Sequence, residues 1–171
     1  MSFPPAHRPD PSRDLTLERT VDVPPELVWA AWTRPEHVKR WFSPAPYTTV
    51  ESEIDLRPGG TFRNVVRSPE GEETTVAGCY LDVVEGERLV WTSVLGPGYR
   101  PALDSFDPPF TAVISLSPTS TGTTYRALVV HGSPEHASRH DEMGFRDGWS
   151  AAWDQLVTVV HELRGDRTPT G

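Results

Sequence analysis

The apolar positions near the C-terminus recur in steps of three and four residues. Within residues 134–163 they fall at Phe145, Trp149, Ala152, Trp153, Leu156, Val160 and Leu163. This spacing places them along one side of a helix, so it predicts one long amphipathic helix over residues 134–163. Gly144 and Gly148 share a face of that helix, which indicates close approach of a neighbouring backbone or space left for another molecule.

Alternation of apolar and polar residues marks the first strand, at 15–23. Pro25 and Pro35 suit the first positions of two short helices, and Thr33 with Glu36 fits a capping box for the second. Turn signals then bound six further strands, at residues 47–56, 61–67, 73–84, 88–95, 110–116 and 123–131. This order predicts an α+β fold in which the long helix covers one face of an antiparallel sheet.

Residues 96–109 form a long connection between two of these strands. The segment carries Tyr99, Leu103 and Phe106, which have no regular period. Connections of this length inside a compact domain are usually functional or disordered. We therefore expect a lid over part of the molecule.

Composition limits the classes of protein that fit the chain. Its 171 residues predict a single domain over 15–164, between disordered tails at 1–14 and 165–171. A net charge of −8 without a basic run argues against nucleic acid and anionic membranes as partners. No apolar run approaches the ~20 residues of a membrane span. Cys79 is the only cysteine, which favours a reducing, cytoplasmic location.

Four segments form a combination known from one protein family. They are VWAAWTRPEHVKRWF at 28–42, DLRPGGTFR at 55–63, the strand pair within 78–91, and EMGFRDGW at 142–149. Together they resemble the family of activators of heat-shock protein 90 ATPase, in the SRPBCC (START-like) superfamily, over about residues 15–163. The resemblance implies the helix-grip fold, a curved seven-stranded antiparallel sheet around a long C-terminal helix with a cavity between them.

The resemblance implies several functions, because lipid carriers, polyketide cyclases and hormone receptors share this fold. We favour binding of a small apolar or amphipathic molecule in the cavity. A cyclase- or hydrolase-like enzyme and a chaperone-interaction module remain alternatives, and so does a homodimer. The family's eukaryotic co-chaperone carries an extra N-terminal domain that residues 1–14 are too short to form, which argues against chaperone activation.

Aromatic and polar residues along the strands, the long connection and the helix are the candidate ligand-binding residues. They are Arg63, Tyr80, Trp91, Tyr99, Phe106, His131, Met143, Trp149 and Trp153. The tryptophans and Tyr80 fit a packed core equally well. Arg63 either points inward to a ligand or outward to a carboxylate such as Glu51, since strand register is not fixed by the sequence. His131 lies at the cavity mouth or on the surface.

His136 and His140 are four residues apart, a spacing that can hold a metal. No further ligand is fixed by the spacing, so we predict no bound metal. Nucleophile motifs, phosphate loops and dinucleotide fingerprints are absent from the sequence. We therefore expect no cofactor, identify no catalytic residue, and place the enzyme second to the binding protein.

Overall fold

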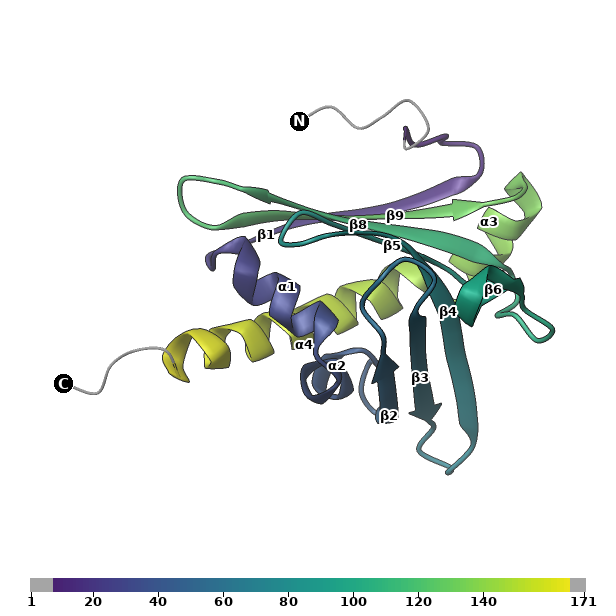
Figure 1. Ribbon diagram of the computed structural model, residues 1–171, viewed down its shortest axis with the longest axis horizontal. Helices are drawn as coiled ribbons and strands as arrows, with labels where there is room; N and C mark the ends of the chain where they lie inside the picture. Colours follow the sequence, from purple (N-terminus) through teal and green to yellow (C-terminus); the bar gives the residue numbers. More distant parts are fainter. Residues whose placement is uncertain (1–7, 167–171) are drawn as a thin grey trace.

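The computed structural model describes residues 8–166 as a strongly curved antiparallel sheet that holds a long helix on its concave side (Figure 1). The elements follow one another as β1 (Asp14–Val21), α1 (Pro25–Thr33), α2 (Pro35–Trp41), β2 (Thr48–Ile54), β3 (Thr61–Arg67), β4 (Glu73–Val84), β5 (Arg88–Thr92), β6 (Leu95–Gly96), the 3₁₀ turn η2 (Pro97–Tyr99), β7 (Arg100–Pro101), β8 (Phe110–Pro118), β9 (Thr123–His131), α3 (Pro134–Glu142) and α4 (Phe145–Asp166). The predicted α+β helix-grip architecture is confirmed.

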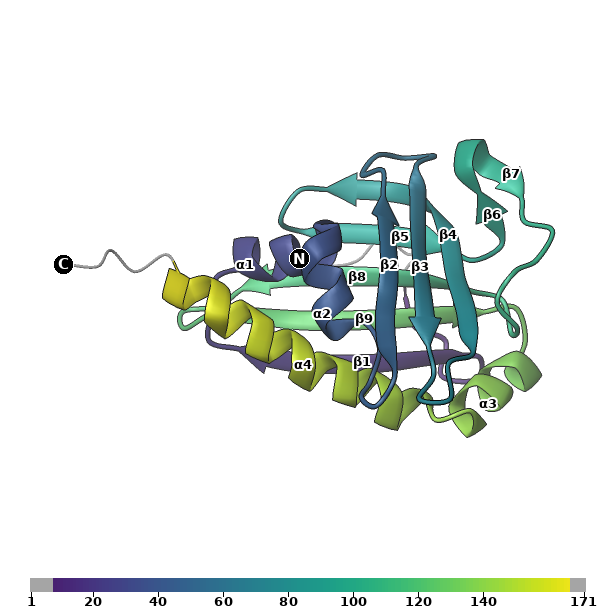
Figure 2. The same ribbon diagram turned by 90° about the horizontal axis from the view of Figure 1, so that it is seen from below.

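The seven strands of the main sheet lie in the order β1-β9-β8-β5-β4-β3-β2. All of their pairings are antiparallel, with register shifts between Thr49 and Glu51 and between Tyr80 and Asp82. Such irregularities bend a strand and increase its local twist. In Figure 2, β2, β3 and β4 run across the direction of the other strands, so the sheet forms a trough.

Helix α4 crosses the open side of this trough, next to α1 and α2 (Figure 2). Its apolar side, including Leu156 and Val160, is buried in the core. Gln155 fixes the helix to the end of α2, because its Nε2 donates to the carbonyl oxygens of Trp41 (3.0 Å) and Ser43 (2.8 Å). Its Oε1 accepts from the Ala45 backbone N–H at 2.9 Å. These bonds set the position of α4 over the sheet.

The single helix predicted over residues 134–163 is two helices in the structure. Helix α3 ends at Glu142 and α4 begins at Phe145. Gly144 lies between them with φ +95°, a conformation that side chains with a Cβ rarely adopt. The apolar period crosses this point without a break, and periodicity carries no information about the sign of φ.

Local features near α1 and the long connection also differ from the prediction. Pro25 and Pro35 begin α1 and α2 as predicted, but the N-cap of α2 is Arg34, with no side-chain cap. The Thr33 hydroxyl instead donates to the Trp29 carbonyl oxygen within α1, at 2.7 Å. The fourth predicted strand ends at Thr92, and β6 pairs with β7 in a separate two-stranded ribbon.

The chain ends bear on the predicted tails. Residues 1–7 and 167–171 lie outside the described residues. Within 8–14, the Asp10 carboxylate accepts from the Ser12 backbone N–H and from Arg13 Nε, both at 2.9 Å, directly before β1. At the other end, α4 continues to Asp166. Within the described part of the chain, no helix is long and apolar enough to cross a bilayer.

Candidate functional site

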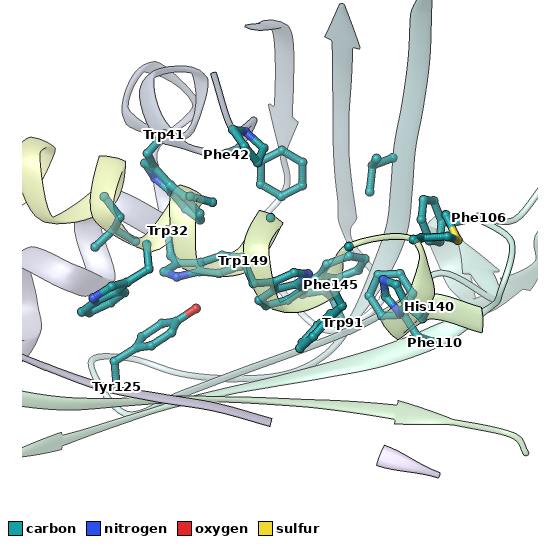
Figure 3. Close-up of a pocket in the computed structure, with 18 residues that line it drawn as sticks. Trp32, Trp41, Phe42, Trp91, Phe106, Phe110, Tyr125, His140, Phe145 and Trp149 are labelled. Atoms are coloured by element: carbon teal, nitrogen blue, oxygen red, sulfur yellow. The ribbon is translucent and has the colours of Figure 1, made fainter. Parts of the chain in front are cut away.

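A cavity of about 230 Å³ lies between α4 and the concave face of the sheet. Figure 3 shows aromatic side chains from both sides converging on it. Its lining consists of Trp32, Trp41, Phe42, Pro44, Val76, Trp91, Phe106, Phe110, Tyr125, His140, Met143, Gly144, Phe145, Gly148, Trp149, Ala152, Trp153 and Leu156. Among residues 8–166, no Asp, Glu, Lys or Arg side chain lines this cavity. It is therefore an aromatic, uncharged site.

Ring contacts hold the aromatic walls in place. Tyr125 of β9 stacks on Trp153 of α4, with ring centroids 4.4 Å apart, and so joins sheet and helix. Trp91 and Phe110 meet edge to face at 5.2 Å on neighbouring strands. Such aromatic pairs contribute about 0.5–1.5 kcal/mol beyond their buried area. The walls thus offer packed ring surfaces against which an apolar molecule can lie.

Gly144 and Gly148 lie beside the cavity. A Cβ on Gly148 would have the Pro44 ring carbon at 4.0 Å as its nearest neighbour, and one on Gly144 would meet nothing within 4 Å. Neither glycine is thus required by a close backbone approach. Of the two explanations offered by the sequence, the structure supports space left in front of the helix.

Two histidines form the polar end of the site. His140 Nδ1 lies 2.9 Å from His131 Nε2, and His131 Nδ1 lies 3.1 Å from the Arg13 carbonyl oxygen. The His140 ring also contacts Phe106, Phe110 and Phe145, at centroid distances of 5.6, 5.2 and 5.2 Å. Figure 3 shows His140 at one end of the cavity, beside Phe110.

Burial sets the protonation of this end of the cavity. The pKa of His140 is lowered to about 4, mainly by burial and to a smaller extent by the neighbouring His131, while Asp141 opposes the shift. Burial also lowers the pKa of His131, although the hydrogen bond to the Arg13 carbonyl and the charge of Asp14 act to raise it. Both imidazoles are therefore neutral at pH 7. At the Tyr125 end, burial raises the pKa of the phenol, so this hydroxyl is neutral too.

Several of the predicted ligand-binding residues meet in the cavity wall. These are Trp91, Phe106, Met143, Trp149 and Trp153, which come from β5, the 96–109 connection, the α3–α4 junction and α4. Of the three apolar residues expected to make the connection a lid, only Phe106 is in the wall. Leu103 is 98% exposed, and Tyr99 is half-exposed beside Gly59.

The remaining predicted residues lie elsewhere. Arg63 points outward, and its Nη1 donates a hydrogen bond to Glu51 Oε2 at 2.9 Å. Of the two orientations considered from the sequence, this is the outward one, toward a carboxylate. Tyr80 is fully buried against Phe62, with ring centroids 5.8 Å apart, and outside the cavity lining. His131 is 3% exposed and lies behind His140 rather than at a mouth or on the surface. An odd or even position in a strand does not reveal which face is concave, so the sequence left these placements open.

Sequence reasoning missed much of the wall, notably Phe42, Phe110, Tyr125 and His140. One signal was present: Tyr125 and His131 are separated by an even number of residues on one strand and therefore share a face. The pairing of Phe110 with His131 brings a third ring to this face. That His140 joins them depends on the break at Gly144, which the apolar period did not reveal.

His136 and His140, whose spacing can hold a metal, do not form a ligand set in the structure. Among the described residues, no group of three His, Cys, Asp or Glu side chains is placed to hold an ion. His140 bonds to His131. The His136 ring instead lies near Gly132: a Cβ placed on that glycine would be 4.0 Å from His136 Nδ1.

Comparisons with known proteins agree with this architecture. The sequence profile of the family described as activator of Hsp90 ATPase homolog 1-like protein matches residues 22–161. A crystal structure of a protein from Nitrosomonas europaea is 43% identical, covers 91% of this chain and 99% of that chain, and superposes with a TM-score of 0.87.

More distant structures share the fold. A protein from Rhodobacter sphaeroides is 21% identical over 91% of this chain and 97% of its own, with a TM-score of 0.79. One from Mycobacterium smegmatis is 21% identical over 94% of each chain, with a TM-score of 0.73. A search of curated proteins found no match.

Proposed function

Because the chain belongs to the family of activator of Hsp90 ATPase homolog 1-like proteins, a family with a cavity-forming fold, we propose that it binds a small, uncharged, largely apolar molecule between α4 and the sheet. The observation that carries the proposal is the aromatic cavity of about 230 Å³. Protein interiors are normally close-packed, and unfilled volume in a core costs stability. A void lined by this many rings therefore supports a binding role.

The size and chemistry of the cavity narrow the class of ligand. Pockets for drug-sized ligands usually measure roughly 300–1,000 Å³. The smaller volume here suits a molecule of one to three rings better than a long-chain lipid. The absence of charged groups from the described lining disfavours a ligand with a formal charge, because an unpaired buried charge is costly.

Titration with the neutral dye N-phenyl-1-naphthylamine, followed by dye emission, tests the proposal. We expect saturable binding near one equivalent, since the dye has two separate aromatic groups and no charge. Native mass spectrometry of freshly purified protein should also reveal a retained small molecule. The matched variants are Gly148→Leu, which places a side chain into the cavity, and Leu103→Ala, which changes a fully exposed residue.

Gly148→Leu should weaken binding of the dye by at least tenfold, whereas Leu103→Ala should bind the dye as tightly as the wild type. If neither this dye nor a varied set of neutral apolar compounds binds, the cavity is not a ligand site and the proposal is wrong.

A chaperone-interaction module is the second candidate, and the family match is what favours it. This function would use an outer surface and would survive filling of the cavity. Co-purification with a heat-shock protein 90 chaperone and a rise in its ATPase rate, both unchanged in Gly148→Leu, would favour this candidate over the binding protein.

A further inference from the structure

The hydrogen bonds of the two histidines define which ring nitrogen faces the cavity with a lone pair. The Arg13 carbonyl oxygen can only accept a hydrogen bond. His131 Nδ1, which lies 3.1 Å from it, must therefore carry a proton and donate the bond. In a neutral imidazole the other nitrogen is then an acceptor. His131 Nε2 must therefore accept from His140 Nδ1, across 2.9 Å.

It follows that the proton of neutral His140 is on Nδ1 and that its Nε2 has the free lone pair. The two nitrogens point to opposite sides of the ring, so Nε2 is directed away from His131. His140 lines the cavity and His131 lies behind it, which turns Nε2 toward the cavity. Within the described residues, nothing in the protein hydrogen-bonds to this atom. A molecule in the cavity, water or a ligand, can therefore donate a hydrogen bond to it.

The surroundings of His140 hold the ring in this orientation. Phe106, Phe110 and Phe145 each contact it, and none of them offers a competing hydrogen bond. At the far end, the Tyr125 hydroxyl points from β9 toward the side on which Trp149 lies (Figure 3). Tyr125 and His131 are six residues apart on one strand, so their Cα atoms are roughly 20 Å apart. Acceptor and hydroxyl thus lie at opposite ends of an elongated, ring-lined site.

We propose that His140 Nε2 accepts a hydrogen bond from the hydroxyl group of an uncharged aromatic ligand, in the simplest case a phenol, and that His131 positions it. This inference rests on the proposed binding function and names the chemical class that the cavity recognises. An aromatic ring fits the walls, and the hydroxyl supplies the hydrogen that Nε2 lacks. A phenolate is excluded because it has no such hydrogen and carries a charge.

The test compares 2-naphthol, naphthalene and 2-methoxynaphthalene by calorimetric titration at pH 7. The hydroxyl of the first probe can donate, whereas the other two probes have no donor. We expect 2-naphthol to bind roughly tenfold more tightly than either, the factor that one buried hydrogen bond supplies. In His140→Phe, the three affinities should become similar while naphthalene binding persists. His161→Phe, the same change on the outer side of α4, should retain the preference.

A second measurement does not depend on any variant. The ¹⁵N resonances of the His140 ring should show a protonated Nδ1 and an unprotonated Nε2, and the Nε2 signal should shift on adding 2-naphthol but not naphthalene. Equal affinities in the wild type, or a preference that survives in His140→Phe, would overturn the inference and leave the binding function intact. Failure of all three probes to bind would overturn the inference, and failure of N-phenyl-1-naphthylamine and other neutral apolar compounds as well would overturn both.

Discussion

At the scale of single residues, Gly144 and Gly148 differ in how their backbone conformation affects stability. Gly144 separates α3 from α4 and has φ +95°, a backbone conformation that a residue with a Cβ rarely adopts. Gly148 lies inside α4, where glycine lowers helix stability by roughly 1 kcal/mol relative to alanine. Nothing crowds a Cβ at either position. Substituting alanine at these two positions therefore tests the effect of backbone conformation on stability without a steric clash.

We predict that Gly148→Ala raises the free energy of unfolding by about 0.5–1 kcal/mol, because it removes the helix penalty and meets only the Pro44 ring at 4.0 Å. Gly144→Ala should instead lower it by about 1 kcal/mol or more, because alanine is strained at this φ. Urea unfolding of both variants checks the prediction. A loss of stability in Gly148→Ala would mean that a glycine is needed at this position for the fold.

At the scale of elements, Trp153 packs α4 against the sheet. Trp153 is 5% exposed and stacks on Tyr125. We predict that Trp153→Ala lowers the free energy of unfolding by about 3–5 kcal/mol, the range for deleting a large buried aromatic side chain. Trp149→Ala should cost less, because Trp149 is only half-buried. Chemical denaturation measures both, and a near-neutral Trp153→Ala would contradict the packing of α4 on the sheet.

The connection between β5 and β8 contributes to the site through one side chain. Phe106 contacts Phe110 at 5.5 Å and His140 at 5.6 Å. Phe106→Ala should weaken binding of N-phenyl-1-naphthylamine by roughly threefold to tenfold, since it removes apolar surface from the wall. Leu103→Ala, in the same connection, should leave the affinity unchanged. Equal effects of the two variants would show that the connection acts as a whole rather than through Phe106.

The elements differ in how far the sequence predicts them. Strands β3, β4 and β9 have the predicted bounds, because turn residues and alternation are local signals. The break at Gly144 and the N-cap at Arg34 were missed, since each depends on a backbone conformation that no pattern specifies. In the site, Trp149 and Trp153 of α4 were predicted. Phe110, Tyr125 and His140 were not, because they depend on register and on sheet curvature.

At the scale of the whole molecule, the buried histidines couple stability to pH. His140 titrates at a pKa of about 4 in the folded protein, against an ordinary value of 6.5. Between these two values the unfolded chain binds more protons than the folded one, so stability falls as pH falls. The pKa of His131 is also lowered, which acts in the same direction. Above pH 6.5 both contributions are complete and constant.

We therefore predict that the free energy of unfolding falls by about 1–3 kcal/mol between pH 7 and pH 4.5, most of it from His140. Asp141 beside His140, and Asp14 and His136 beside His131, bear on the size of the change without reversing its sign. The carboxylates whose pKa is lowered by hydrogen bonds, Asp10 and Asp22, lose their contribution below their ordinary value of 3.8 and so outside this window. Urea unfolding at several pH values, with His140→Phe as the control, measures the effect. The variant should show a shallower pH dependence between pH 7 and 4.5. Parallel curves for the two proteins would mean that His140 is not held neutral by its burial, and the assignment of its Nε2 as a free acceptor would lose its basis.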